Sequence, residues 1–315
     1  MRLAVVGAGA VGTSVAELAG EYGHTVTALA DSSGAAVDAA GLDVDAVLDR
    51  KSREGSVGSA APDAALDAEY DALVEATPTT LGDAEPGFSH VRAALERDRH
   101  VVLANKGPVA ERYADVRALE RESAGEVLME ATVAGAIPAL STITDVGAQH
   151  VTAVRGVLNG TANFVLSRMA AEGLDYEHVL AEAQDLGVAE ADPSFDVQGT
   201  DAALKCVIVA NLLYDEEYTL ADADVEGIES IPGSALELAA EDGRTVRLIG
   251  EVADGEVSVG PRLVPERGTL AVTGTRNIVQ LETEHAGRLN LSGRGAGGPE
   301  TASAVLADVG RLSRS

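Results

Sequence analysis

The sequence predicts an α/β protein of two domains, in which a doubly wound parallel sheet forms the first domain and the second is of the α+β class. Three observations support this fold class. A glycine-rich turn follows a short apolar segment at the amino end, strand and helix patterns alternate as far as residue 130, and longer helices mixed with hairpins follow. The length of 315 residues allows two hydrophobic cores.

The first thirty residues predict one strand–helix–strand unit. Residues 3–6 are apolar and end at a glycine, which is typical of a buried parallel strand. Helical spacing follows over residues 11–22, and Gly23 ends it. The β-branched segment 25–30 predicts a second strand that closes at Asp31. The other elements expected of this domain are strands at 72–74, 100–103 and 126–129 and helices at 89–97 and 109–122.

From about residue 131 the pattern predicts a second domain of mixed strands and helices. Asp254-Gly255 separates two apolar segments, which indicates a hairpin with strands at 246–252 and 257–263. A second antiparallel pair is expected at 278–284 and 288–292. The remaining elements expected are a strand at 151–158, helices at 161–171, 176–186 and 199–213, and a final helix at 300–312 with Pro299 in its first position.

The composition argues against several classes of partner. Acidic residues outnumber basic ones by 51 to 23, so the formal net charge is −28, and binding to a nucleic acid, which needs lysine and arginine clusters, is not expected. No apolar run approaches the roughly 18 residues of a membrane-spanning helix. The single cysteine, Cys206, allows no intrachain disulfide. We therefore expect a cytoplasmic protein that binds neither nucleic acid nor membrane.

The acidic residues are spread along the whole chain, and only three lysines occur: Lys51, Lys106 and Lys205. This composition predicts a surface adapted to concentrated salt, because a Debye length of about 3 Å at 1 M screens the repulsion between like charges. The hypothesis concerns the habitat of the protein and not its chemistry.

The turn that begins at Gly7 has the spacing of a dinucleotide-binding fingerprint, with glycines at positions 7, 9 and 12. The first glycine permits the tight turn, the second lets the backbone approach a pyrophosphate, and the third packs the helix against the strand. The helix N-terminus offers unpaired N–H groups and a partial positive charge to the anion. Because a strand before and a helix after the turn are both predicted, we expect a Rossmann-type domain. Its cofactor-binding residues are then Gly7, Gly9, Ala10, Val11 and Gly12.

The choice between NAD and NADP stays open. Asp31 closes the second predicted strand, where a carboxylate accepts a hydrogen bond from a ribose 2′-hydroxyl and disfavours a 2′-phosphate. Arg50, Lys51 and Arg53 offer cations for that phosphate instead. Asp31-Ser32-Ser33 also fits an ordinary turn.

Several segments, taken in order, resemble homoserine dehydrogenases. The segments most similar to that family are 189–193, which reads AEADP, and 196–205, which reads DVQGTDAALK. The others are 75–79, 104–108, 130–138, 156–164 and 293–298 with 301–304. The resemblance extends over essentially the whole chain, and the ordered segments with matching spacing, six when 189–193 and 196–205 are taken together, are far more specific than any one of them.

The resemblance implies NAD(P)-dependent interconversion of L-homoserine and L-aspartate 4-semialdehyde, a step of threonine and methionine biosynthesis, in a homodimeric enzyme. It also implies that the final helix returns to the cofactor domain. Residues 1–130 with 294–315 then form the dinucleotide-binding domain, and residues 131–293 form an inserted domain for substrate binding and dimerisation. Because the sequence stops soon after its last glycine motif, we expect no C-terminal regulatory domain of the kind that other family members have.

Lys205 and Asp201 are the first candidates for catalysis, because a cation near the reacting oxygen stabilises a developing alkoxide. They are four residues apart on an expected helix, so the carboxylate can hold the ammonium in position. A surface ion pair is the commoner explanation of such spacing, but an apolar run follows Lys205 and favours a buried helix. A chain with so few lysines also keeps them where arginine cannot replace them.

Lys106 follows a predicted strand at its carboxyl end, where open α/β sheets bind ligands, although a loop lysine is the alternative. In the family, the positions matching Lys106 and Lys205 serve substrate binding and proton transfer. We assign proton transfer to Lys205 and substrate orientation, with a share in proton transfer, to Lys106.

The resemblance also implies the residues that recognise the substrate and the cofactor. Glu190 and Asp196 match acids that contact the substrate, whose α-ammonium needs carboxylate partners. Asn159-Gly160-Thr161 opens an expected helix whose free N–H groups can meet the substrate carboxylate. The further cofactor-binding residues are Thr77, Pro78, Asn105, Lys106, Gly295 and Gly297.

Residues 130–137 resemble the monovalent-cation site of the family. There, backbone carbonyls at the positions matching Val133, Gly135 and Ile137 join the acid that matches Glu130. Ligation by oxygen alone suits a hard cation, Na⁺ or K⁺. The alternative is that Glu130 caps the helix that follows.

Two other functions remain open from the residues alone. A semialdehyde dehydrogenase that acts through a thioester needs an activated cysteine, and Cys206 lies in an apolar helical run, where a packed side chain is the better interpretation. A non-catalytic dinucleotide-sensing protein is the second alternative. The combined presence of Lys106, Glu190 and Lys205 speaks against it.

Overall fold

The computed structural model describes residues 1–312 and divides into two compact units. The first unit comprises residues 1–136 and the chain from residue 296 onward, and the second comprises residues 137–295. The boundaries predicted from the sequence fell after residues 130 and 293. Residues 313–315 of the predicted first domain lie outside the described residues. Within residues 1–312, no helix combines the length and the apolar character needed to cross a membrane.

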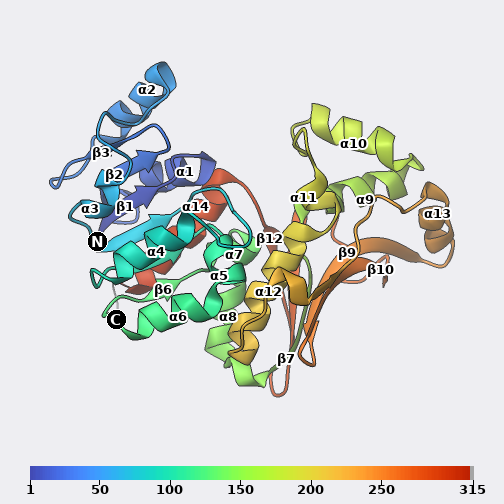
Figure 1. Cartoon of the computed structure of the whole chain (residues 1–315). Helices are drawn as coiled ribbons and strands as arrows, with labels where there is room; N and C mark the ends of the chain where they lie inside the picture. The colour runs from blue at the N-terminus through green and yellow to red at the C-terminus, as the bar shows by residue number, and fades with distance from the viewer. Residues whose placement is uncertain (313–315) are drawn as a thin grey trace. The chain divides into compact units, whose positions relative to one another are not determined.

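The first unit is built on a six-stranded sheet in the order β3-β2-β1-β4-β5-β6 (Figure 1). Its strands are β1 (Arg2–Val6), β2 (Thr25–Asp31), β3 (Gly34–Val37), β4 (Ala72–Glu75), β5 (His100–Leu103) and β6 (Val127–Leu128). Neighbouring strands run parallel except β2 and β3. The strand order reverses at β1, so the carboxyl ends of β1 and β4 flank the switch point, where open α/β sheets bind ligands.

Helices complete the first unit. They are α1 (Ala10–Leu18), α2 (Val44–Glu54), α3 (Ala64–Asp67), α4 (Gly87–Leu95), α5 (Gly107–Glu111), α6 (Tyr113–Arg121), α7 (Ala131–Ala134) and α14 (Gly298–Leu312). The C-terminal α14, red in Figure 1, packs along α1. A Cβ on Gly298 would lie 2.8 Å from the carbonyl oxygen of Ala10, so the two helices begin in close contact. Val5, Val15 and Leu306 belong to the core that this packing closes.

Several elements of this unit differ from the sequence-based expectation, and the short α3 is one that was not expected. The single helix expected over 109–122 is wrong: α5 and α6 are separate, because Arg112 leaves the helical region at φ −137° and places its guanidinium 4.0 Å from the centre of the Phe88 ring. The final helix begins at Gly298, so Pro299 is its second residue. The antiparallel edge strand β3 was not expected.

Helix α2 was also not expected. None of its residues is fully buried, and its short apolar face, Val44, Val47 and Leu48, packs against the core only partly buried. It begins at an Asp43 side chain that accepts a hydrogen bond from the Ala46 N–H, and it ends at Gly55 in the left-handed region. These two capping residues are the local signals that indicate it.

The second unit is built on a six-stranded sheet in the order β12-β11-β7-β9-β10-β8. Its strands are β7 (Val151–Val157), β8 (Ala223–Val225), β9 (Arg244–Ala253), β10 (Glu256–Pro265), β11 (Arg276–Thr283) and β12 (Gly287–Arg294). Both expected hairpins, β9–β10 and β11–β12, are confirmed. Among these strands only the short β8, which was not expected, pairs in parallel.

The helical elements of the second unit are α8 (Ala139–Val146), η1 (Ala148–His150), α9 (Gly160–Glu172), α10 (Tyr176–Asp185), α11 (Ser194–Val197), α12 (Thr200–Tyr214), η2 (Leu220–Asp222) and α13 (Gly233–Glu241). Helices α9, α12 and α13 all contact β9. A separate apolar cluster, which includes Ile249 and Ile278, packs under residues 270–272. Helices α8 and α13 were not expected. The predicted class, a doubly wound sheet with a second α+β unit, is confirmed.

Candidate functional site

The glycine turn joins β1 to α1 at the switch point of the first sheet. A Cβ on Gly12 would lie 1.9 Å from the Gly7 carbonyl oxygen, and one on Gly7 would lie 2.4 Å from the backbone of Ala76. A Cβ on Gly9 would meet nothing within 4 Å. The turn thus packs tightly on its own helix and on the end of β4, while Gly9 and Ala10 stay exposed. This open backbone next to a helix N-terminus fits a dinucleotide pyrophosphate.

The loops after β4 and β5 are joined through Asn105. Its side-chain amide donates to the Thr77 hydroxyl at 3.1 Å, and its carbonyl accepts from the Gly107 N–H at 2.9 Å. Lys106 is half-buried at the start of α5, and its N–H donates to the Thr79 hydroxyl. The structure therefore brings Thr77, Asn105 and Lys106 of the predicted site together, and exposed Pro78 lies in the same loop as Thr77.

Asp31 ends β2 in an ion pair with Lys51 of α2. One carboxylate oxygen accepts from the backbone N–H groups of Ser33 and Gly34, and the other is 2.6 Å from the Lys51 ammonium. Burial alone would raise the pKa of Asp31, but the Lys51 and backbone hydrogen bonds outweigh it and lower the pKa. The bonds from Ser33 and Gly34 fit the interpretation of residues 31–33 as a turn, and the acceptance of a ribose hydroxyl by Asp31 stays a prediction.

Lys205 and Asp201 form a buried pair on α12 in the second unit. The Lys205 ammonium donates to the Asp201 carboxylate at 2.6 Å and to the Leu158 carbonyl at 2.7 Å, and its side chain is 9% exposed. The commoner explanation of the spacing, a surface ion pair, does not apply here. Burial of both partners makes their geometry rigid, because separating them would leave an unpaired charge in the core.

Asn159 links this pair to Asp196. Its amide donates to Asp196 at 2.6 Å and to Asp201 at 2.9 Å, while its carbonyl caps α9 by accepting from the Ala162 N–H. Burial raises the pKa of Asp196, and the nearby Asp201 adds to this, although hydrogen bonds from Asn159 and Thr161 oppose it. The cluster is thus a set of carboxylates held around one ammonium.

Gly160 and Glu190, both predicted to bind the substrate, have different surroundings: the first is packed and the second is exposed. Gly160 is the first residue of α9, where a Cβ would lie 3.0 Å from the Thr275 carbonyl oxygen. Glu190 is exposed, and the contacts described for residues 1–312 contain no hydrogen bond between its carboxylate and the cluster. The structure brings together Asn159, Thr161, Asp196, Asp201 and Lys205, but it does not join Glu190 to them.

The segment predicted to bind a cation begins at Glu130, the N-cap of α7. Glu130 is buried, its N–H donates to Asp308 at 2.9 Å, and its carboxylate is 3.7 Å from the Arg311 guanidinium. Burial raises the pKa of Asp308 to about 6, and the nearby Glu130 charge contributes to the rise. Val133 and Gly135 are buried in the same unit, and Ile137 is the first residue of the second unit. Asp308 and Arg311, which touch Glu130, were not identified from the sequence.

The last glycine motif contains two different environments. A Cβ on Gly295 would overlap the Asn277 side chain at 2.3 Å, so Gly295 is needed for close packing in the second unit. Gly297 is exposed and has a φ of +124°, a conformation that side-chain-bearing residues rarely adopt. It lies directly before α14, whose first turn faces the first turn of α1.

Cys206 is unsuited to nucleophilic catalysis. The thiol is fully buried next to Gly250 of β9, and burial raises its pKa to about 12. The thiolate is the reactive form of cysteine. Because the pKa is raised, almost no thiolate of Cys206 is present near neutral pH. This environment supports the interpretation of Cys206 as a packed side chain and argues against the thioester mechanism.

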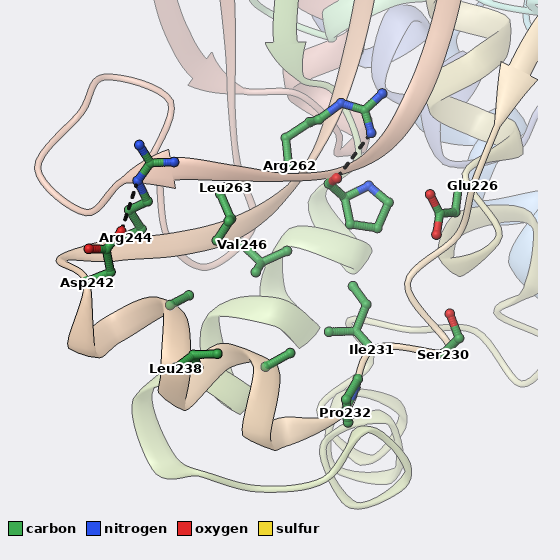
Figure 2. Close-up of a pocket in the computed structure, with 13 residues that line it drawn as sticks. Glu226, Ser230, Ile231, Pro232, Leu238, Asp242, Arg244, Val246, Arg262 and Leu263 are labelled. Atoms are coloured by element: carbon green, nitrogen blue, oxygen red, sulfur yellow. Dashed lines mark hydrogen bonds and ion pairs between the residues drawn. The ribbon is translucent and has the colours of Figure 1, made fainter.

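A pocket of about 780 Å³ opens in the second unit between α13 and strands β9 and β10 (Figure 2). Apolar side chains line it, and Leu238 is 68% exposed. At its margin Arg244 pairs with Asp242 at 3.5 Å, and Arg262 donates to the Pro261 carbonyl. The residues that line this pocket do not include any predicted site residue.

The histidines show no metal-binding spacing in the sequence, but the fold places two of them close together. Donor atoms of His150, Glu284 and His285 lie within 4.8 Å of one another beside the β11–β12 turn. The Glu284 carboxylate accepts from His150 Nδ1 at 3.0 Å, and the His285 side chain is 77% exposed. None of these three residues belongs to the Asn159–Lys205 cluster, that is, to Asn159, Thr161, Asp196, Asp201 and Lys205.

A dinucleotide turn at the switch point and a buried lysine–carboxylate cluster together define an NAD(P)-dependent oxidoreductase. Residues 138–309 match the family model of homoserine dehydrogenase, and residues 1–82 match that of glutamate, leucine, phenylalanine and valine dehydrogenases. The chain belongs to the homoserine dehydrogenase family.

Named relatives and solved structures agree with this assignment. The chain is 37% identical to the homoserine dehydrogenase of Methanocaldococcus jannaschii, over 98% of this chain and 97% of that protein. It is 35% identical to the NAD(+)-dependent homoserine dehydrogenase of Pseudomonas canavaninivorans, over 100% and 96%. A putative homoserine dehydrogenase from Archaeoglobus fulgidus superposes with a TM-score of 0.92 at 39% identity, over 99% of each chain. A hyperthermophilic archaeal homoserine dehydrogenase in complex with NADPH superposes with a TM-score of 0.86 at 26% identity, over 99% and 97%.

Proposed function

We propose that the chain interconverts L-homoserine and L-aspartate 4-semialdehyde with NAD(P), and that Lys205 transfers the proton. The observation that supports this best is the buried Lys205 ammonium, held by Asp201 and Leu158. An ammonium has three N–H groups, and these two acceptors use two of them. One N–H is then left for an oxygen of the substrate.

The proton step follows from this arrangement. The bound nicotinamide cofactor supplies or accepts the hydride at the carbon that carries the oxygen. In the reducing direction the Lys205 ammonium donates a proton to the aldehyde oxygen, so that the developing alkoxide becomes the hydroxyl of homoserine. In the oxidising direction the neutral amine accepts that proton. Asp201 keeps the amine in place in both directions.

Recognition of the amino-acid end of the substrate is assigned to the neighbouring carboxylates and donors. Asp196 and Glu190 would bind the α-ammonium, and the N-terminal N–H groups of α9 would bind the α-carboxylate, beside Asn159 and Thr161. Lys106 is assigned the orientation of the substrate, with a share in proton transfer. Glu190 is exposed, so its carboxylate is open to a bound substrate.

The residues at the end of β2 are compatible with either cofactor. Asp31 can accept from the ribose hydroxyls of NAD, and Lys51 can neutralise the 2′-phosphate of NADP. One relative is named for NAD(+) dependence, and one solved structure of the family contains NADPH. We therefore propose that both cofactors bind and that Asp31 and Lys51 set the preference.

Further properties are proposed from the family and the composition. The enzyme is a cytoplasmic homodimer of threonine and methionine biosynthesis, with a small-molecule substrate as its partner and none among nucleic acids or membranes. Its surface is adapted to salt.

A monovalent cation, Na⁺ or K⁺, binds to Glu130 and to the carbonyls of Val133, Gly135 and Ile137, where the buried Glu130 carboxylate supplies the negative charge. Equilibrium sedimentation and activity in Na⁺-free and K⁺-free buffer test the dimer and the ion.

Replacing Lys205 by arginine tests the proton-transfer role. Arginine keeps the positive charge but does not release its proton near neutral pH, so we expect kcat for homoserine oxidation to fall roughly 10²- to 10⁴-fold. The change in absorbance of NAD(P)H measures it in both directions. Binding of NAD(P)H to Lys205→Arg, measured by calorimetry, should stay close to that of the unchanged protein.

The matched control is Arg247→Lys, which also exchanges a buried cation in the second unit. Arg247 binds the Val272 and Val246 carbonyls, and it lies outside the Asn159–Lys205 cluster. The Arg247→Lys variant should have a lower melting temperature and a nearly unchanged kcat. Normal turnover by Lys205→Arg would refute the assignment.

The two alternative functions predict different results. A dinucleotide sensor would bind cofactor without turnover, and a thioester enzyme would lose activity in Cys206→Ser.

A further inference from the structure

Glu75 is a fully buried carboxylate at the switch point of the first sheet. It is the last residue of β4, and it is 0% exposed. Its partners in the sheet register are Val6 on β1 and Leu103 on β5, both apolar. A carboxylate in an apolar row is costly unless it is hydrogen-bonded, so packing alone does not explain why this position is acidic.

One oxygen of Glu75 binds both the loop after β4 and the loop after β5. Oε1 accepts from the Thr77 N–H at 2.9 Å and from the Thr77 hydroxyl, and it accepts from the Asn105 amide at 3.3 Å. Asn105 in turn holds the Gly107 N–H. A single carboxylate oxygen thus fixes the loop after β4, which the glycine turn touches at Ala76, and the loop that presents Lys106.

The other oxygen of Glu75 is fixed from α4. His90 Nδ1 lies 2.6 Å from Oε2, and the His90 side chain is 13% exposed. The carboxylate therefore has donors on both oxygens and cannot rotate without breaking one set of hydrogen bonds. Charge-assisted hydrogen bonds of this kind are about twice as strong as neutral ones.

We propose that Glu75 and His90 form a positioning pair that sets the two loops of the first unit against which the nicotinamide half of the cofactor binds. The inference rests on the proposed function of this unit as the cofactor site. Neither residue transfers a proton to the substrate. Their effect on the reaction is transmitted through Thr77 and Asn105 to the bound cofactor and to the backbone of Lys106.

Two substitutions that test the pair, Glu75→Gln and His90→Leu, change hydrogen bonding and leave the side-chain size nearly constant. Glu75→Gln replaces one acceptor oxygen by an amide donor, which opposes either the Thr77 N–H or the His90 N–H. His90→Leu removes the donor, and His90→Asn keeps a donor nitrogen on the same γ-carbon. The matched control is Asp71→Asn, directly before β4, where the carboxylate binds Arg2 at 2.8 Å at the opposite end of the strand.

We expect Glu75→Gln and His90→Leu to weaken NAD(P)H binding about tenfold, measured by calorimetry, since losing one charge-assisted hydrogen bond is worth about one decade in affinity. Hydrogen exchange at the Thr77 and Gly107 amides should accelerate in both variants. His90→Asn should restore most of the affinity. Asp71→Asn should lower the melting temperature while affinity and amide exchange at Thr77 stay unchanged. The kcat of Glu75→Gln should fall together with the affinity, because Lys106 loses its fixed backbone.

Two results would overturn the proposal. One is normal cofactor affinity in Glu75→Gln and His90→Leu, and the other is an equal loss of affinity in Asp71→Asn, which would attribute the effect to stability. Failure of the proposed function gives a different pattern, because a protein without homoserine turnover still reports cofactor binding and amide exchange in these variants. A Glu75→Gln protein that does not fold leaves His90→Leu and His90→Asn to decide the question.

Discussion

At the scale of single residues, the proposal that Asp31 and Lys51 set the choice between NAD and NADP rests on the ion pair between them. Asp31 is hydrogen-bonded on both oxygens and its pKa is lowered, so it remains a carboxylate at neutral pH. The 2′-phosphate of NADP would bring a second negative charge next to Asp31, and a cation must therefore neutralise it. Lys51 is the cation in contact with Asp31, whereas Arg50 pairs with Glu54 and Arg53 with Asp49 on the same helix.

Replacing Lys51 by alanine should separate the two cofactors. We expect KM for NADP⁺ to rise about tenfold or more, because the 2′-phosphate would face Asp31 without its cation. The KM for NAD⁺ should change less than threefold. Steady-state kinetics with each cofactor measure both, and Arg53→Ala, which removes an exposed helix pair, is the control. Equal loss with both cofactors would show that Lys51 supports the fold and not the choice.

At the scale of elements, the contact between α12 and β9 positions Lys205, the residue proposed to transfer the proton. Gly250 of β9 lies against Cys206, and the Leu158 side chain lies against the same glycine. Lys205, the neighbour of Cys206, donates to the Leu158 carbonyl. A helix, a strand and the end of β7 therefore share one tightly packed point, and the Lys205 ammonium is fixed by it.

A methyl group on Gly250 should disturb this point. In Gly250→Ala the new Cβ would lie 2.4 Å from the Cys206 sulfur, so we expect the free energy of unfolding to fall by about 1–3 kcal/mol and kcat to fall with it. The double variant Gly250→Ala with Cys206→Ala removes the sulfur and should recover part of both. Urea unfolding and steady-state kinetics measure them. Gly20→Ala, where a Cβ meets nothing within 4 Å, should be nearly neutral, and an equal loss there would contradict the packing argument.

At the scale of the whole molecule, the net charge of −28 dominates the electrostatics. Self-repulsion of this size opposes the compact state, and it is felt most at low ionic strength. Ion pairs such as Arg168 with Glu172 and Glu182 relieve it locally, but they neutralise only a fraction of the 51 acidic residues. Stability should therefore depend on the surrounding salt more than on any single surface pair.

Thermal unfolding in KCl tests this expectation. The melting temperature should rise steadily from about 0.1 M to above 1 M, because the Debye length shortens from about 10 Å to about 3 Å over this range. Sucrose at matched viscosity is the control, since it favours compact states without screening charge. A melting temperature that stays flat or falls in KCl would show that the acidic surface is not an adaptation to salt.

Local signals made most of the fold predictable. Apolar strands bounded by glycine, the alternation of strands and helices, and the Asp254-Gly255 turn each depend on neighbouring residues only, and the structure confirms them. The break at Arg112 was not predictable, because it depends on the Phe88 ring of another helix. Helix α2 was not predicted, although Val44, Val47 and Leu48 have helical spacing; this apolar face is short and only partly buried.

The candidate site divides in the same way. The glycine turn and the Asp201–Lys205 spacing are local patterns, so the sequence by itself determined that a dinucleotide turn precedes a helix and that a lysine and a carboxylate share a helix face. Only the tertiary structure decided that this pair is buried, that Asn159 joins it to Asp196, and that Glu75 meets His90. Hydrogen bonds between residues distant in sequence depend on how strands and helices pack, and no periodicity along the chain records that packing.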